Sequence, residues 1–192
     1  MQRFQVPDEI AIRVPPADMH AAVAAIFGTL GCPPDDRLHC ADALLYADLR
    51  GIDSHGVSNM MPTYVGMLKQ GYVNPAPSLR VLREADATAT VDCDRGLGLT
   101  IGPQCMDLAL DKAERCGIGS VVATNGRHFG AAAYHAVRAL EREMIGVALT
   151  VERGLCQLDA WNLSHNHPLR NTSQHFATLP NASQHFVPAR TT

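Results

Sequence analysis

"PQCMDLALDKAERCGIGSVVATNGRHFGAAAYHAVRALEREMIGVALT", residues 103–150, decides the fold class because two kinds of apolar periodicity alternate along it. Residues 102–116 carry apolar side chains at helical spacing. A short apolar run at 119–124 predicts a buried strand, 131–143 is helical again, and 144–150 predicts another strand. Alternation of helix and strand indicates the α/β class.

Three helices are predicted upstream of this stretch. Apolar spacing predicts the first helix over 17–30. The second follows Asp35 or Asp36, whose carboxylate can accept from the free N–H groups of a first turn, and Gly51 can close its far end. A short third helix follows Ser58, the expected N-cap.

The rest of the chain divides into a sheet region and a tail. Two β-favouring stretches, 78–84 and 87–93, fit a hairpin or adjoining strands. We therefore expect a helical region over 1–78 and an incomplete mixed-sheet α/β domain over 79–150. Periodicity is lost over 151–192, which is expected to be an irregular tail that does not extend the sheet.

The composition is that of an ordinary soluble globular protein. The 192 residues are 46% hydrophobic and 18% charged, with a formal net charge of -3. No basic patch favours nucleic acid, so small molecules or other subunits are the expected partners. The N-terminus lacks the apolar core of a signal peptide, and no segment approaches the roughly 18 apolar residues of a membrane span. We expect a cytoplasmic protein with no membrane partner.

The cysteines and the tail histidines give little sign of a metal site. Six cysteines occur without a C-x-x-C pair, mostly in apolar runs, which favours buried free thiols over zinc or disulfides. His165 and His167 could hold a metal, but only Cys156 and Asp159 lie near them in sequence. A solvated polar tail is the favoured interpretation, and no metal is expected.

A glycine-rich loop between the second β-favouring stretch and the next helix has two interpretations. The spacing Gly96-x-Gly98-x-x-x-Gly102 resembles a dinucleotide fingerprint, which would cradle phosphates. In such a fingerprint the next strand ends in an acidic residue that binds the ribose, whereas here it ends in Thr124 and Asn125. A structural strand-to-helix turn is therefore favoured over a phosphate cradle.

Two histidines lie in loops where chemistry could take place. His128 stands between a strand and a helix N-terminus, the position where ligands gather in α/β proteins, and His55 follows the second helix in D-S-H-G. An imidazole there can exchange a proton near neutral pH, although a structural or merely exposed histidine is the alternative. His20, His39 and His135 lie within helical patterns and are expected to be structural.

The residues around both histidines carry a resemblance. DLRGIDSHGVSNMMPTYVGMLKQGYVNP and the stretch from ATVDCDRGLGLTIG to MIGVALT resemble the malate/L-lactate dehydrogenase family, which includes ureidoglycolate and sulfolactate dehydrogenases, over about 17–150. The resemblance implies an oxidoreductase that transfers hydride between NAD or NADP and C2 of a small 2-hydroxy or 2-oxo acid. It also implies a homodimer and a cofactor fold without the Rossmann fingerprint, which supports the structural interpretation of the glycine loop.

The resemblance also assigns site residues. His55 matches the family's D-S-H-G histidine and His128 its H-F-G histidine. Either is expected to act as the acid/base, and the sequence does not decide between the two. Ser54 and Asn125 match small polar positions that could orient the substrate. Asn59 stands where many members carry an arginine for the substrate carboxylate, so this contact keeps a hydrogen bond but loses its charge.

The chain departs from the family pattern in two ways: Asn59 replaces the arginine, and the resemblance ends near residue 150. Arg50 or Arg127 could supply the charge of the missing arginine. After residue 150 the chain lacks the remainder that supplies most cofactor contacts in the family, so the cofactor-binding residues are unknown and a truncated or frame-shifted member is expected. The alternatives are a non-catalytic fragment or interaction module that pairs with a full-length relative, and a Rossmann reductase that uses the glycine loop.

Overall fold

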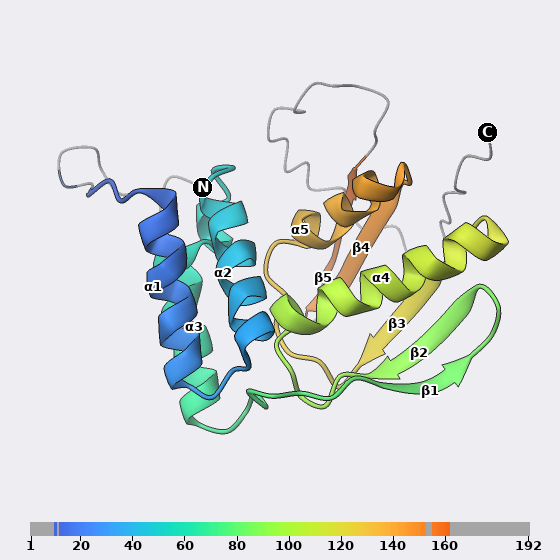
Figure 1. Ribbon diagram of the computed structural model, residues 1–192, viewed down its shortest axis with the longest axis horizontal. Helices are drawn as coiled ribbons and strands as arrows, with labels where there is room; N and C mark the ends of the chain where they lie inside the picture. Colours follow the sequence, from blue (N-terminus) through green and yellow to red (C-terminus); the bar gives the residue numbers. More distant parts are fainter. Residues whose placement is uncertain (1–9, 11, 153–154, 162–192) are drawn as a thin grey trace.

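The computed structural model describes residues 10, 12–152 and 155–161. Its N-terminal part is a group of three helices, and the rest combines a long helix with short strands (Figure 1). The three helices are α1 (Pro16–Thr29), α2 (Pro34–Asp48) and α3 (Val57–Lys69). The three predicted helices are thus confirmed.

The helix starts differ from the expected caps. Helix α2 begins with Pro34, whose missing N–H costs nothing in the first turn, so Asp35 and Asp36 lie inside that turn and make no capping hydrogen bond. Helix α3 begins after Gly56, and the N–H of Val57 donates to the Asp48 carboxylate at 3.0 Å. Ser58 is therefore not the N-cap. Gly51 has φ +68°, the left-handed conformation expected after a helix.

A three-stranded mixed sheet follows the helices. Strand β2 lies in the middle, antiparallel to β1 and parallel to β3. Helix α4 (Gly98–Cys116) connects the parallel strands and packs on the sheet through Ile101 and Cys105, which contact Val91. The strands are β1 (Arg80–Glu84), β2 (Thr88–Asp92) and β3 (Ser120–Thr124). The expected mixed α/β class is confirmed.

The end of the described chain departs from expectation in two places. The helical stretch 131–143 is split into α5 (Ala132–Ala136) and a 3₁₀ helix, η3 (Val137–Arg142). Strand β4 (Gly146–Glu152) pairs antiparallel with β5 (Leu155–Trp161) in a separate sheet. Because β5 falls within the tail expected to be irregular, that expectation is wrong for these residues.

Burial separates the two parts of the chain. The largest apolar cluster fills the space between the N-terminal helices, with Phe27, Leu44 and Tyr64 fully buried. The sheet's cluster is small, β1 is exposed throughout, and Val122 of β3 is 57% exposed. The prediction that 119–124 is a buried strand is therefore wrong, because α4 covers only one face of the sheet and Val122 points to the other.

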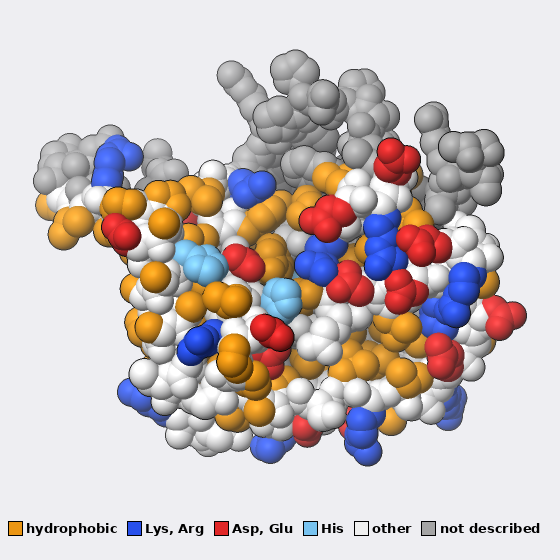
Figure 2. Space-filling view, viewed as in Figure 1, with side chains coloured by type: hydrophobic (Ala, Val, Ile, Leu, Met, Phe, Trp, Pro, Cys, Tyr) orange, Lys and Arg blue, Asp and Glu red, His pale blue; other side chains and the backbone are white. Residues whose placement is uncertain are grey.

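Acidic and basic side chains interleave on the surface shown in Figure 2. Arg138 of η3 pairs with Asp107 of α4 at 2.8 Å. None of the described helices is long and apolar enough to cross a membrane. Four of the free cysteines are buried as expected, but Cys116 is exposed at the end of α4. His165 and His167 lie outside the described residues.

Candidate functional site

The fold brings the two loop histidines together. His55 ends a short 3₁₀ helix, η2 (Asp53–His55), between α2 and α3, and His128 lies in the loop after β3. Both side chains are half-buried, and their rings stack with centroids 5.6 Å apart and planes 21° apart. Residues far apart in the sequence thus form one imidazole pair.

Helix α2 holds the His55 loop through the side chain of Asp48. The carboxylate of Asp48 accepts from Val57, and a side chain at Gly56 would collide with this carboxylate. Burial raises the pKa of Asp48, and the Val57 N–H opposes that shift. The Asn59 amide donates to the carbonyl of Asp53 at 2.6 Å, which fastens η2 to the first turn of α3.

The His128 loop is fastened to the start of α4. The N–H of Gly98 donates to the His128 carbonyl at 3.0 Å, and a side chain at Gly98 would collide with Phe129. The ring Nδ1 of His128 lies 2.8 Å from the Tyr64 hydroxyl of α3 and accepts the Gly130 N–H at 3.2 Å. The backbone and a buried helix residue therefore fix this ring.

The predicted polar residues fall in different places. Ser54 lies at the pair, with its hydroxyl 2.9 Å from His55 Nδ1. Asn59 supports η2, since its amide nitrogen donates to Asp53 and at 3.3 Å to the Ser58 hydroxyl. Asn125 has φ +54° and donates to Asp92 at 3.0 Å, which ties β3 to β2. Ser54 therefore contacts the histidine pair directly. The hydrogen bonds of Asn59 and Asn125 are instead with residues that support the surrounding loops and strands.

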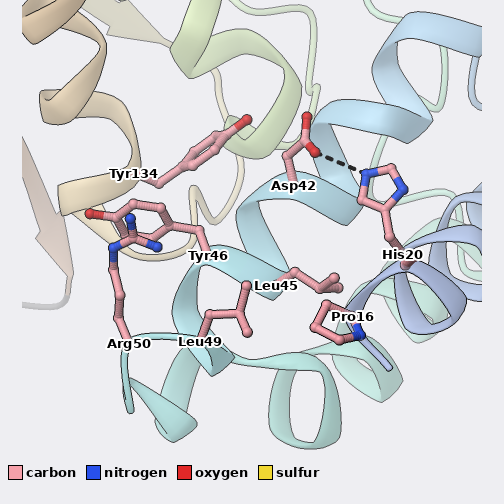
Figure 3. A pocket seen from close by; sticks show the side chains of 9 residues that line it. Pro16, His20, Asp42, Leu45, Tyr46, Leu49, Arg50 and Tyr134 are labelled. Carbon is pink, nitrogen blue, oxygen red and sulfur yellow. Dashed lines mark hydrogen bonds and ion pairs between the residues drawn. The ribbon is translucent and has the colours of Figure 1, made fainter. Parts of the chain in front are cut away.

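The two candidate replacement arginines contact an aromatic ring and the backbone. The Arg50 guanidinium stacks 3.8 Å from the Tyr46 ring centre, and both side chains line an open hollow of about 450 Å³ (Figure 3). The same hollow holds a hydrogen bond between His20 Nε2 and the Asp42 carboxylate at 2.9 Å. Arg127 donates to the carbonyl of Tyr72 at 3.0 Å. A carboxylate contact from either arginine stays a prediction.

The glycine loop is occupied by the chain itself. Side chains at Gly96, Gly98 and Gly102 would meet Pro77, Phe129 and His135, respectively. Glycine is thus required for close packing of the loop, as the structural interpretation expects. Among the residues described, no group of three or more His, Cys, Asp or Glu could hold a metal ion.

A larger hollow of about 730 Å³ lies between α4, β3 and β4. Apolar side chains such as Met106, Val121 and Ala148 line it, together with Asn125 and His135. Neither His55 nor His128 is among its lining residues. The hollow therefore adjoins the H-F-G loop without containing the imidazole pair.

Two contacts of the site were not foreseen. The Tyr64 hydroxyl reaches His128 from a helix in which nothing in the local pattern distinguishes Tyr64 from a core residue. His135 is buried, and its Nε2 lies 2.7 Å from the Phe129 carbonyl, within the H-F-G motif. Burial lowers the pKa of His135 to about 4, so the neutral ring donates this hydrogen bond.

One known family matches most of the chain. The sequence model described as malate/L-lactate dehydrogenase matches residues 14–157, three quarters of the chain. The chain belongs to the malate/L-lactate dehydrogenase family. The match contains both histidine loops, and the resemblance inferred from D-S-H-G and H-F-G is therefore confirmed.

Individual members of the family show the extent of the likeness. Malate dehydrogenase of Pyrococcus horikoshii is 43% identical over 148 residues, 77% of this chain and 41% of the relative. L-sulfolactate dehydrogenase of Methanocaldococcus jannaschii is 37% identical over 70% of this chain and 39% of the relative. A solved structure of the Pyrococcus enzyme has a TM-score of 0.71 at 34% identity, covering 81% of this chain and 52% of that one. The chain spans about two fifths of the length of these curated relatives.

Proposed function

We propose that the chain carries the proton-transfer residues of an NAD- or NADP-dependent dehydrogenase that acts at C2 of a small 2-hydroxy or 2-oxo acid. The observation that carries this proposal is the stacked pair of His55 and His128 in a member of the malate/L-lactate dehydrogenase family. Relatives named malate and sulfolactate dehydrogenase support 2-hydroxy acids as the substrate class. By the same resemblance, the chain works as a homodimer.

The chemistry of such a reaction explains the imidazole pair. Oxidation of a secondary alcohol releases a hydride from carbon, which a bound nicotinamide would accept, and a proton from oxygen. A base must take that proton, and in the reverse direction an acid must return it to the ketone oxygen. Imidazole does both near neutral pH. We assign this exchange to the pair, while substrate contacts from Ser54, Asn59 and Asn125 stay predictions.

The glycine loop packs closely against the chain itself, since side chains at Gly96, Gly98 and Gly102 would meet Pro77, Phe129 and His135, respectively. We therefore assign no cofactor contact to this loop, and only the proton steps are assigned to named residues. The exposure of β1 and of Val122 in β3 favours a second candidate, a non-catalytic module that pairs with a full-length relative.

The first test is a titration of the purified chain with NADH and with NADPH, followed by nicotinamide fluorescence, with the molecular mass measured on the same sample. Saturable binding to a dimer supports the dehydrogenase. No binding by the chain alone, together with formation of a mixed dimer with a full-length relative, contradicts it and supports the pairing module.

The second test assigns the proton transfer. His55→Ala and His128→Ala are each expected to lower kcat with 2-oxo acids by about 10²-fold or more, the usual contribution of a general acid or base, with unchanged cofactor affinity. His39→Ala, a substitution in α2, serves as the matched control and is expected to leave kcat unchanged. Unaltered turnover in both test variants would refute the assignment.

A further inference from the structure

The hydrogen bonds at Nδ1 of His128 distinguish the two histidines of the pair. This nitrogen accepts the Gly130 N–H at 3.2 Å and lies 2.8 Å from the Tyr64 hydroxyl. A backbone N–H is a donor only, so it requires a lone pair on the ring nitrogen that it meets. In the neutral ring one nitrogen carries the proton and the other accepts. The proton of a neutral His128 therefore belongs on Nε2.

Tyr64 reinforces this arrangement from the core. Its side chain is fully buried in α3, and its ring centre lies 5.7 Å from that of His128. Burial raises the pKa of the Tyr64 phenol, so the hydroxyl keeps its proton and has it to donate. Two donors thus converge on one acceptor, Nδ1.

His55 has a different partner. Its Nδ1 lies 2.9 Å from the Ser54 hydroxyl, which rotates and can either donate or accept. The Ser54 contact is compatible with both neutral tautomers and with the charged ring. His55 can therefore gain and lose a proton without losing this hydrogen bond, whereas a proton on Nδ1 of His128 would oppose the Gly130 N–H.

We propose that Tyr64 is a positioning residue that, together with the Gly130 amide, holds His128 as the Nε2–H tautomer. His128 then acts as a hydrogen-bond donor toward the substrate oxygen, and the proton is exchanged at His55. This division rests on the proposed dehydrogenase function. It also suits the stacking of the two rings at 5.6 Å, because two charged imidazoles at that separation would repel each other.

The test is the ring ¹⁵N spectrum of the full chain without cofactor or substrate, recorded above the pH at which its histidines are charged. His128 is expected to show an acceptor-type resonance at Nδ1 and a protonated resonance at Nε2. Tyr64→Phe, which keeps the ring in the core, is expected to lower the ratio of Nε2–H to Nδ1–H tautomers by roughly fivefold, equivalent to about 1 kcal/mol for one hydrogen bond. It should also shift the Nδ1 resonance.

Control variants separate this effect from general loss of structure. Tyr46→Phe removes another buried tyrosine's hydroxyl, in the α2 hollow of Figure 3, and is expected to leave the His128 resonances unchanged. Ser54→Ala is expected to move the resonances of His55 and leave those of His128 unchanged. If Tyr64→Phe does not fold, difluorotyrosine at position 64, a stronger donor, is expected to move the Nδ1 resonance in the direction of stronger hydrogen bonding.

A wild-type spectrum with the proton on Nδ1 of His128 would overturn the proposal. So would identical His128 resonances in the wild type and in the Tyr64 variant. Because no cofactor or substrate is present, either result is independent of whether the chain binds NADH. Failure of this inference is thereby distinguished from failure of the proposed function.

Discussion

The helical part and the sheet part of the chain differ in how completely they bury their own apolar residues. Phe27, Leu44 and Tyr64 are fully covered by neighbouring helices, whereas β1 is exposed and Val122 of β3 is 57% exposed. In a helix, apolar residues at helical spacing mark the face that another element covers, so the sequence shows which side is buried. A short apolar strand run does not show whether one or both of its faces are covered.

The largest expected effect tests this difference directly. Phe27→Ala removes a ring from the helical core and is expected to lower the free energy of unfolding by about 3–5 kcal/mol. Val91→Ala removes two methyl groups from the sheet cluster and is expected to cost about 1.5–2 kcal/mol. Val23→Ala, the size-matched change in the helical core, is expected to cost more than Val91→Ala, because the larger cluster leaves a better-defined cavity. Urea unfolding followed by circular dichroism measures all three values, and equal costs of the two valine variants would show that the two cores are equally well packed.

A smaller effect is expected where α4 meets the hairpin of β1 and β2. The side chain of Lys112 is 1% exposed, and its ammonium donates to the Ala85 carbonyl and to Glu84, each at 2.8 Å. Lys112→Ala is expected to lower the free energy of unfolding by about 2 kcal/mol, through lost hydrogen bonds and lost packing of the stem. Lys112→Met, which refills the stem's volume, is expected to recover about half. Equal stability of both variants would assign the whole effect to the ammonium.

The smallest effect concerns pH and the element that supports the H-F-G loop. Burial lowers the pKa of His135 to about 4 in the folded chain, against about 6.5 in the unfolded chain. As the pH falls from 6.5 toward 4, the unfolded chain takes up a proton that the folded chain refuses, so stability falls. Between pH 7 and 5.5 this contribution is about 1 kcal/mol, at 1.36 kcal/mol per pKa unit.

The variant His135→Gln separates this contribution from other titrating groups. The Gln side-chain nitrogen can still donate to the Phe129 carbonyl, but it does not titrate in this range. Chemical unfolding at several pH values is expected to show a shallower loss of stability for the variant than for the wild type. Parallel curves would place the pH dependence elsewhere in the chain.

The sequence predicted the elements better than their ends. Helices and strands up to residue 150 were located from periodicity, because apolar spacing and the flanking glycines are local signals. The N-cap of α2 was wrong because the helix begins at Pro34, which places Asp35 and Asp36 inside its first turn. The N-cap of α3 was wrong because the Asp48 carboxylate reaches Val57 from another helix. Strand β5 was missed although Cys156, Leu158 and Ala160 alternate with Gln157 and Asp159, which is the period of a strand, so a local signal was overlooked. Its pairing with β4 is visible only in the backbone register.

The candidate site shows the same limit. His55 and His128 could be named because their motifs are short and local, and the structure brings them together. The Tyr64 contact joins residues 64 positions apart, and a tyrosine on a buried helix face resembles any other core residue. The scaffold contacts of Asn59 and Asn125 likewise depend on neighbours that the spacing does not indicate.

The parallel pairing of β2 with β3 also has a consequence for the order of folding. The helices around His55 form from neighbouring residues, but His128 reaches its place only after α4 has crossed the sheet and β3 has joined β2. Contacts between distant parts of a chain close late, because the entropy of the intervening loop must be lost first. The imidazole pair is therefore expected to form in the last steps of folding. The ring ¹⁵N resonances of His128 would then also report when the chain is fully folded.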